Sequence, residues 1–91
     1  EIGDLVRLMT LQSGVVSMVE FTVPHDSALI GRTLGSVAWP NEATVVAILR
    51  DDIPLAPSQD DVIEGGDELF FVTTIVAEDE LRTVLRTTGE Q

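Results

Sequence analysis

Residues 43–49 read Ala-Thr-Val-Val-Ala-Ile-Leu, which is a nearly continuous apolar run with the length of one strand. Such a short run without polar alternation favours a strand that is buried on both faces. Residues 50–52 then predict a turn, and residues 53–55 a short return strand. Pro54 places that return strand at the edge of a sheet, because proline has no N–H group to donate to a neighbouring strand. The middle of the chain is therefore predicted to be a β-hairpin.

Strand patterns continue on both sides of this hairpin. Residues 15–23 alternate apolar and polar side chains over most of their length, as expected of a strand with one buried face. Residues 68–74 form another apolar strand directly after residues 64–67, Glu-Gly-Gly-Asp, which predict a tight turn. Few of the connections are long enough to hold a helical crossover, so the sheet is expected to be mostly antiparallel.

Helical patterns occur in three other stretches. Apolar side chains recur at steps of three and four in residues 1–12, which predicts an N-terminal helix. A short helix is predicted over residues 34–39, and Pro40 ends it. Residues 77–86 carry acidic side chains in their first turn and arginines towards their end, which complements the helix dipole and predicts a helix after the last strand.

Together these elements predict an α+β fold: a small, mostly antiparallel sheet, a helix after the last strand and an N-terminal linker helix. The 91 residues allow one small domain. We expect residues 1–14 to form the linker helix, residues 15–87 the domain and residues 88–91 a tail. The first residue is Glu1 rather than methionine, so we interpret the chain as a piece of a longer protein.

The charge of the chain excludes several classes of partner. Sixteen acidic residues against five arginines, with no lysine, give a net charge of −11. Nucleic-acid binding depends on clustered Lys and Arg, and so does docking on anionic lipid. No apolar run approaches the ~20 residues that span a bilayer. We therefore expect no nucleic-acid partner and no direct membrane insertion.

The sequence offers no convincing catalytic or metal site. Residues 25–27 read His-Asp-Ser, but three consecutive residues of one loop rarely converge as the side chains of a hydrolase triad do. The absence of cysteine and the single histidine exclude thiolate and multi-histidine metal sites. The acidic loop 60–68 is the best candidate for a divalent cation, although it lacks the Asp-x-Asp-x-Asp-Gly spacing. We expect no enzyme, no catalytic residue and no metal.

The order of several short motifs resembles the RCK C-terminal domain, also called the TrkA-C domain. That family has a glycine-basic-threonine-leucine step, then an apolar strand ending in arginine, then a proline and a Gly-Asp turn before the next strand. In this sequence the motifs are Glu20-Phe21-Thr22-Val23, Leu29-Ile30-Gly31-Arg32-Thr33-Leu34, Trp39-Pro40, Val45-Val46-Ala47-Ile48-Leu49-Arg50, Pro57 and Val62-Ile63-Glu64-Gly65-Gly66-Asp67-Glu68-Leu69. The resemblance runs from about Val19 to Leu85.

This resemblance implies a regulatory protein of a Trk/Ktr-type potassium uptake system, or the cytosolic gate of a potassium channel. It implies a cytoplasmic protein, peripheral to the inner membrane through a membrane potassium transporter or channel subunit. In such proteins a Rossmann domain that binds NAD(H) or ATP precedes this domain, which itself holds no nucleotide cofactor of that kind. The domain is expected to form a homodimer, and the apolar stretches at residues 1–12 and 34–39 support this. The alternative is a purely structural dimerisation module of another cation transporter or antiporter, without a ligand.

The resemblance also implies a ligand site. In some members cyclic di-AMP binds in the dimer cleft, on the segment that corresponds to residues 37–45, which suggests Ala43, Thr44 and Val45 as pocket lining. Arg32 is added from the sequence itself, because it is the one base between Arg7 and Arg50 and could meet an anionic group. Binding members tend to carry an Arg before this strand and an Asn near its start. Those residues are missing here, so an empty cleft is the competing expectation.

Overall fold

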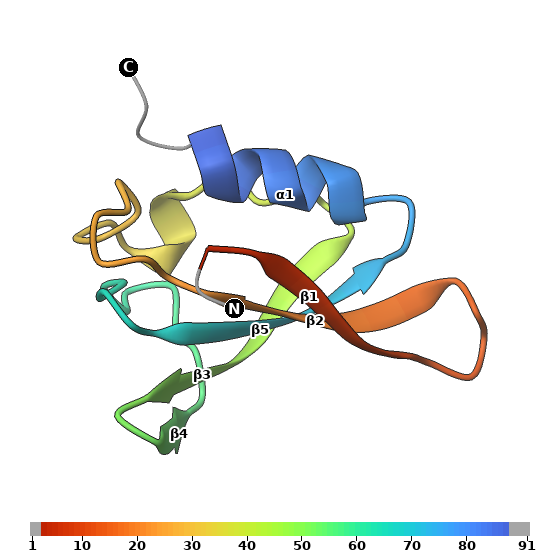
Figure 1. Cartoon of the computed structure of the whole chain (residues 1–91), viewed down its shortest axis with the longest axis horizontal. Helices are drawn as coiled ribbons and strands as arrows, with labels where there is room; N and C mark the ends of the chain where they lie inside the picture. Colours follow the sequence, from red (N-terminus) through yellow and green to blue (C-terminus); the bar gives the residue numbers. More distant parts are fainter. Residues whose placement is uncertain (1–2, 88–91) are drawn as a thin grey trace.

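Five antiparallel strands form one sheet in the computed structural model, which describes residues 3–87 apart from the side chain of Thr87 (Figure 1). The strand order is β1-β2-β5-β3-β4, and the helix α1 lies across one face of the sheet. The elements are β1 (Leu5–Thr10), β2 (Val16–Thr22), the 3₁₀ turn η1 (Leu34–Ser36), β3 (Ala43–Arg50), β4 (Ile53–Leu55), β5 (Glu68–Thr74) and α1 (Glu78–Thr87). The predicted antiparallel sheet and the helix after its last strand are confirmed, whereas the predicted tail at residues 88–91 lies outside the described residues.

The hydrophobic core lies between the sheet and α1. Successive side chains of a strand point to opposite faces, so each of the central strands β2 and β5 sends alternate residues into the core. Leu81 and Leu85, four residues apart on one side of α1, pack against them. Each such fully buried leucine contributes about 2 kcal/mol to folding. The side chains that β2 and β5 bury on this face are Ser17, Val19, Phe21, Leu69, Phe71 and Thr73.

The predicted N-terminal helix is wrong, because residues 5–10 form strand β1, paired with β2. A register shift between Arg7 and Met9 explains why the sequence pattern does not predict this strand. Arg7 lies opposite Val19, on the core face, whereas Met9 lies opposite Met18 on the other face. The bulge therefore breaks the period of two by which a strand is recognised, and the remaining apolar spacing imitates a helix.

One ion pair fastens β1 to the start of α1. The guanidinium of Arg7 donates to both carboxylate oxygens of Glu78, from Nε at 2.9 Å and from Nη2 at 2.8 Å. The buried Ser17 hydroxyl donates to the same carboxylate at 2.6 Å. The hydrogen bonds from Arg7 hold the pKa of Glu78 below its usual value, with burial opposing and Ser17 reinforcing that shift. The same contact raises the pKa of Arg7.

The predicted helix over residues 34–39 is limited to one 3₁₀ turn, η1. Residues 31–35 run against residues 59–63, and backbone hydrogen bonds of 2.8–2.9 Å join the two segments. An N–H group that donates across to another segment is not available for an α-helical bond. This pairing therefore replaces the helix that the apolar spacing predicted. It also brings residue 59 next to Gly35, beside the pocket described below.

Strand β3 is confirmed, but the prediction that it is buried on both faces is wrong. Val45 lies opposite Phe71 of β5, on the core face, and Thr44 lies opposite Val72 on the other face. A register shift between Val45 and Ala47 leaves Val46 unpaired and 40% exposed. The return strand β4 pairs only with β3 and forms the edge of the sheet, as Pro54 predicted. The apolar run of β3 therefore reflects its position between β5 and β4 in the sheet, and it does not mean that both faces of β3 are covered.

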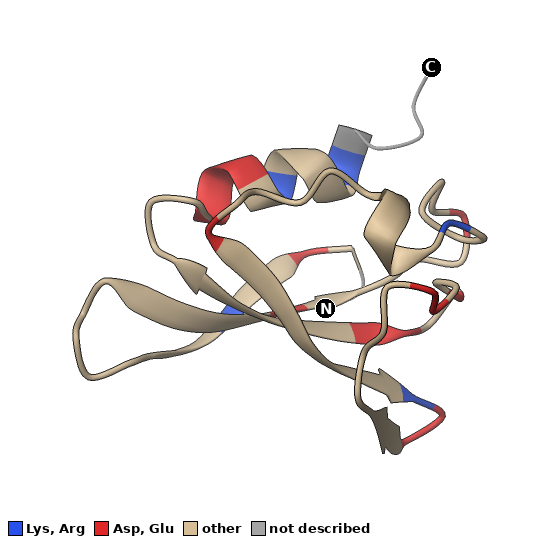
Figure 2. Cartoon of the chain, turned by 180° about the vertical axis from the view of Figure 1, so that it is seen from behind, with Lys and Arg blue, Asp and Glu red and all other residues tan. Residues whose placement is uncertain are grey.

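Charge is unevenly distributed over the molecule. Figure 2 shows acidic residues mainly at loops, turns and the start of α1, whereas the loop that joins β1 to β2 has none. Residues 8–19, which include this loop, contain no charged side chain in a chain of net charge −11. Several apolar side chains are exposed near its tip. Among residues 3–87, no helix is long and apolar enough to cross a membrane.

Candidate functional site

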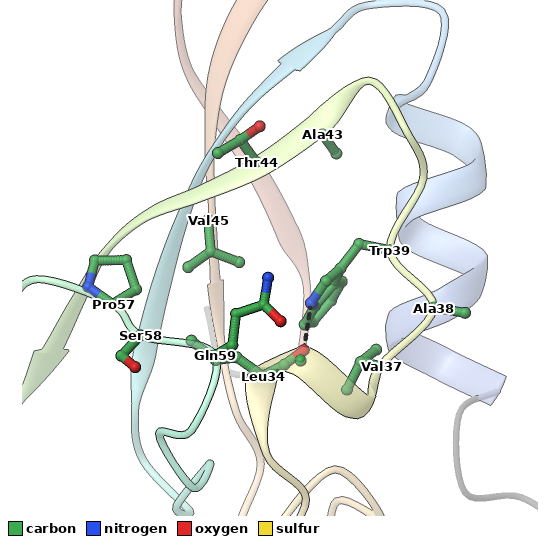
Figure 3. Close-up of a pocket in the computed structure, with 11 residues that line it drawn as sticks. Leu34, Val37, Ala38, Trp39, Ala43, Thr44, Val45, Pro57, Ser58 and Gln59 are labelled. Atoms are coloured by element: carbon green, nitrogen blue, oxygen red, sulfur yellow. Dashed lines mark hydrogen bonds between the residues drawn. The ribbon is translucent and has the colours of Figure 1, made fainter.

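A pocket of about 400 Å³ opens beside the first residues of β3 (Figure 3). Three segments form it: η1 with the residues that follow it, the start of β3, and residues 57–59. None of the lining residues is charged. They are Leu34, Gly35, Val37, Ala38, Trp39, Ala43, Thr44, Val45, Pro57, Ser58 and Gln59. A pocket of this size with apolar walls and a few neutral polar groups fits a small organic molecule better than a metal ion or an isolated phosphate.

Trp39 forms one wall of this pocket in a fixed orientation. Its ring meets Phe71 edge-on, with the ring centroids 5.2 Å apart and the planes at 63°. Its indole Nε1 donates to the carbonyl oxygen of Leu34 at 3.0 Å, the dashed line in Figure 3. Because a buried indole N–H needs an acceptor, this bond fixes the ring against η1. The pocket therefore has one rigid aromatic wall.

The structure brings three of the four predicted ligand residues to this pocket. Ala43, Thr44 and Val45 all belong to its lining. Strand alternation gives Thr44 a different direction, because its side chain lies on the face of β3 opposite to that of Val45. Arg32 is not among the lining residues, and its guanidinium donates instead to the carbonyl oxygen of Ser36. Whether any of the four binds a ligand stays a prediction.

Sequence reasoning did not identify Trp39, Pro57 or Gln59 as pocket residues. Their place in the pocket depends on the ladder between residues 31–35 and 59–63, which no local pattern predicts. Trp39 and Pro57 did have a signal, because both belong to the motifs of the family resemblance. Gln59 had none.

The arginine that ends β3 has a structural partner. Arg50 donates to both carboxylate oxygens of Asp67, with Nε and Nη2 each at 2.9 Å, and Nη2 also reaches the carbonyl oxygen of Val62 at 2.9 Å. Asp67 is 2% exposed, and it also accepts a bond from the backbone N–H of Glu64. These bonds to Asp67 raise the pKa of Arg50. The pair explains why an arginine and a Gly-Asp turn occur together, and it leaves neither group for a ligand.

The glycine pair before Asp67 meets two different requirements. A Cβ at Gly65 would come within 2.8 Å of Nδ1 of His25, and Gly66 has a φ of +86°. Only glycine meets both conditions without strain. His25 therefore packs on this turn. Within residues 3–87 no hydrogen bond joins His25 to Ser27, whose hydroxyl accepts from the N–H of Leu29 at 3.0 Å.

The acidic loop 60–68 has protein partners for several of its carboxylates. Asp67 binds Arg50, Glu64 lies 3.3 Å from the same guanidinium, and Asp61 accepts from the N–H of Ser58 at 2.8 Å. No three side chains of the metal-ligating kinds gather at one point in the described part of the chain. The structure thus adds no support for the divalent-cation interpretation of this loop.

Comparison with known proteins gives one family. The TrkA-C domain family model matches residues 18–86. The Trk system potassium uptake protein TrkA of Mycobacterium tuberculosis is 42% identical over 84 residues, which cover 92% of this chain and 38% of that protein. The chain therefore spans well under half of this relative's length.

Solved structures agree with this assignment. The GsuK channel bound to NAD contains a region with the same fold, with a TM-score of 0.80 at 16% identity over 97% of this chain and 16% of that one. The RCK_C domain dimer of S. agalactiae BusR in complex with c-di-AMP is 32% identical, with a TM-score of 0.61, over 72% of this chain and 91% of that one. The family model over most of the chain and the mycobacterial relative together show that this chain belongs to the TrkA-C domain family.

Proposed function

We propose that the chain is the C-terminal regulatory domain of a potassium uptake or channel-gating protein, and that it senses a small ligand rather than catalysing a reaction. The observation that carries this proposal is the pocket beside β3, which includes Ala43, Thr44 and Val45, the segment that the family resemblance had pointed to. The similarity to a potassium uptake protein supports the choice of ion. The BusR domain that resembles this chain is in complex with c-di-AMP, which supports the choice of ligand class.

Regulation of this kind requires a ligand that prefers one of two arrangements of the protein. A ligand shifts an equilibrium only by the difference between its affinities for the two states. A pocket formed by three separate segments meets this requirement, because their relative movement would change its shape. In the longer protein, a preceding Rossmann domain would bind NAD(H) or ATP. A membrane potassium transporter or channel subunit would receive the signal, with the protein held at the cytoplasmic side of the inner membrane.

Isothermal calorimetry with cyclic di-AMP, AMP and ATP tests the ligand part of this proposal. We expect cyclic di-AMP to bind and to raise the melting temperature, as any ligand that binds only the folded state does. Trp39 is the only tryptophan, so its fluorescence reports on the pocket directly. If none of the three compounds produces heat or a melting shift, the alternative of a purely structural dimerisation module is favoured instead.

A homodimer is the second part of the proposal. The two stretches that first suggested it contain a strand and a 3₁₀ turn instead of helices, so the support now comes from the apolar side chains that are exposed in and next to the hairpin of β1 and β2. We call this surface the hairpin patch. It consists of the exposed side chains of Leu8, Met9, Leu11, Val15 and Val76. Residues 15 and 75 are joined by a backbone hydrogen bond of 2.9 Å, which brings Val76 to the hairpin.

The charge of the chain favours a second copy as the occupant of the hairpin patch. Two chains of net charge −11 repel each other least where they have no charged side chains, and residues 8–19 carry none. An exposed apolar patch without charge is typical of an interaction site. The BusR neighbour was solved as an RCK_C domain dimer, which is consistent with self-association.

Light scattering at high micromolar concentration tests the dimer. We expect the mass of a dimer for the wild type and of a monomer for a Met9→Glu, Val15→Glu variant. Ile53→Glu is the matched control, because Ile53 is equally exposed but lies in β4 at the opposite edge of the sheet. A wild-type monomer, or a dimer that survives the double substitution and is lost in the control, would contradict the hairpin patch as the interface.

A further inference from the structure

No local sequence pattern predicts the position of the Gln59 side chain in the pocket. In Figure 3 its amide points into the space between Val45 and Trp39. It makes no hydrogen bond to any residue of the described part of the chain, 3–87. A primary amide offers two donor hydrogens and an accepting oxygen, so it can bind a ligand edge that carries both kinds of group.

Gly35 leaves room for this amide, which belongs to an exposed residue. The N–H of Gly35 donates to the backbone carbonyl of Gln59 at 2.9 Å, which fixes the two residues side by side. A Cβ at Gly35 would come within 2.8 Å of the Gln59 amide oxygen, 3.0 Å of its Cβ and 3.2 Å of its carbonyl oxygen. A methyl group would therefore push the Gln59 side chain away. The absence of a side chain at residue 35 is what lets the amide lie against η1.

The lining also limits which part of a ligand this pocket can bind. The other polar side chains there are hydroxyls, and the indole N–H of Trp39 is already bonded to Leu34. With no charged lining residue, the pocket has no side chain that would bind a phosphate as an ion pair. A flat, uncharged heterocycle matches an aromatic wall and an amide, and a glutamine amide makes a two-bond pair with the amino and ring-nitrogen edge of adenine.

We propose that Gln59 is the specificity-determining residue of this pocket and that it selects an adenine-type base through its amino edge. This inference rests on the proposed function, because it assigns the group that distinguishes one ligand from another in the same pocket. Phosphate groups of such a ligand lie outside the lining, so the base rather than the charge determines selection. Gly35 acts as a positioning residue through Gln59.

Uncharged nucleosides test the inference without interference from phosphate. Adenosine and inosine differ at the six position, where inosine has a carbonyl group instead of the amino group. The folded domain is titrated with each, with Trp39 fluorescence and calorimetry as readouts. We expect the wild type to prefer adenosine by at least about fivefold, which corresponds to the discrimination of one two-bond contact. The affinity for adenosine should not depend on ionic strength.

Three variants separate the role of the amide from general damage to the pocket. Gln59→Leu keeps the bulk but removes the amide, so we expect adenosine and inosine to bind equally. Gly35→Ala should weaken the preference in the same way by displacing Gln59. Asp60→Asn is the matched control, since Asp60 follows Gln59 in the same loop but does not line the pocket, and it should keep the wild-type preference.

The outcomes distinguish this inference from the function on which it rests. Equal binding of adenosine and inosine by the wild type, or a preference that survives Gln59→Leu, would overturn the role of Gln59 and leave a ligand-sensing domain in place. Absence of binding by adenosine, inosine and cyclic di-AMP together would overturn both. A preference that is present in the wild type and Asp60→Asn, but absent in Gln59→Leu and Gly35→Ala, supports the proposal.

Discussion

Two arginines in this domain each bind a carboxylate through two hydrogen bonds, but the two pairs connect different parts of the fold. Arg50 and Asp67 join the end of β3 to the turn before β5, inside the region that the family model matches. Arg7 and Glu78 join β1, which lies before that region, to the start of α1. The first pair therefore lies within the matched region, and the second fastens β1 to it.

Burial differs between the two pairs and indicates how much each one contributes. The side chain of Asp67 is 2% exposed and that of Arg50 is 26% exposed, whereas that of Arg7 is 45% exposed. Solvent weakens an ion pair when either partner remains hydrated. The Arg50–Asp67 pair should therefore matter for the stability of the whole domain. The Arg7–Glu78 pair should matter mainly for keeping β1 attached, because β1 has exposed side chains along most of its length.

The largest expected effect comes from Asp67→Ala. The substitution removes the buried carboxylate that accepts two bonds from Arg50 and one from the N–H of Glu64, and removing one partner of a buried pair costs about 3 kcal/mol of unfolding free energy. Urea denaturation at pH 7 measures the loss. Asp60→Asn is the control, because Asp60 is exposed and its carboxylate has no partner among residues 3–87, and it should change stability by less than about 0.5 kcal/mol. Equal losses in the two variants would contradict the structural role of the Arg50–Asp67 pair.

A smaller loss is expected from Glu78→Ala at the second pair. The buried Ser17 hydroxyl loses its acceptor, which costs about 2 kcal/mol of unfolding free energy and is measured by urea denaturation at pH 7.

Arg7→Met should detach β1 while the core stays folded. Hydrogen exchange would then show faster exchange of the β1 amides with little change in β5. Arg86→Met is the control, since the side chain of Arg86 has no hydrogen-bond or ion-pair partner in the described part of the chain. If β1 and β5 lose protection together in Arg7→Met, the two pairs do not differ in the way proposed here.

The pH dependence of stability should distinguish a carboxyl group that is paired with an arginine from one that lies beside another carboxyl group. The pKa of Glu78 is lowered in the folded state, so its contribution is present above its ordinary value of 4.5 and is lost as the pH falls through the lower folded pKa. The pKa of Glu68 is raised, mainly by its hydrogen bond with Glu20 and then by burial. Ionised Glu68 therefore destabilises the fold at neutral pH, and this penalty disappears as the pH falls through its folded pKa.

Glu68→Gln tests the second of these pH effects. We expect the variant to be more stable than the wild type at pH 7, with the difference shrinking as the pH approaches 4.5 from above. Urea midpoints measured from pH 7 to pH 4.5 follow the change, and Asp60→Asn again serves as the control. If the difference from the wild type is the same at both ends of the range, Glu68 and Glu20 do not share a proton in the folded state.

The sequence predicted the elements in which apolar side chains recur with the regular spacing of a strand or a helix. Residues 68–74 form a strand with the predicted bounds, and the helix begins one residue after its predicted start. It failed at β1, where a bulge removes the alternation, and at residues 34–39, where pairing with a distant segment replaces a helix. The candidate site divides in the same way. Ala43 and Val45, which the family resemblance suggested, line the pocket, whereas Gln59 was missed because only long-range pairing brings it there.

The smallest expected effect lies in the two-residue turn that follows Arg50. Asp51 and Asp52 have φ values of 52° and 65°, the left-handed region in which two-residue hairpin turns favour Asn and Gly. Asp52→Gly should relieve this strain and stabilise the domain by about 0.5 kcal/mol, because the gain exceeds the extra entropy of an unfolded glycine. The charge of Asp52 contributes to the raised pKa of Glu68. Asp52→Ala removes this charge, as Asp52→Gly does, but it keeps the unfavourable backbone angle. The Gly variant should therefore be about 1 kcal/mol more stable than the Ala variant in urea denaturation at pH 7. If the two variants are equally stable, the charge of Asp52 rather than its backbone angle determines the effect, and the strain next to the Arg50–Asp67 pair is negligible.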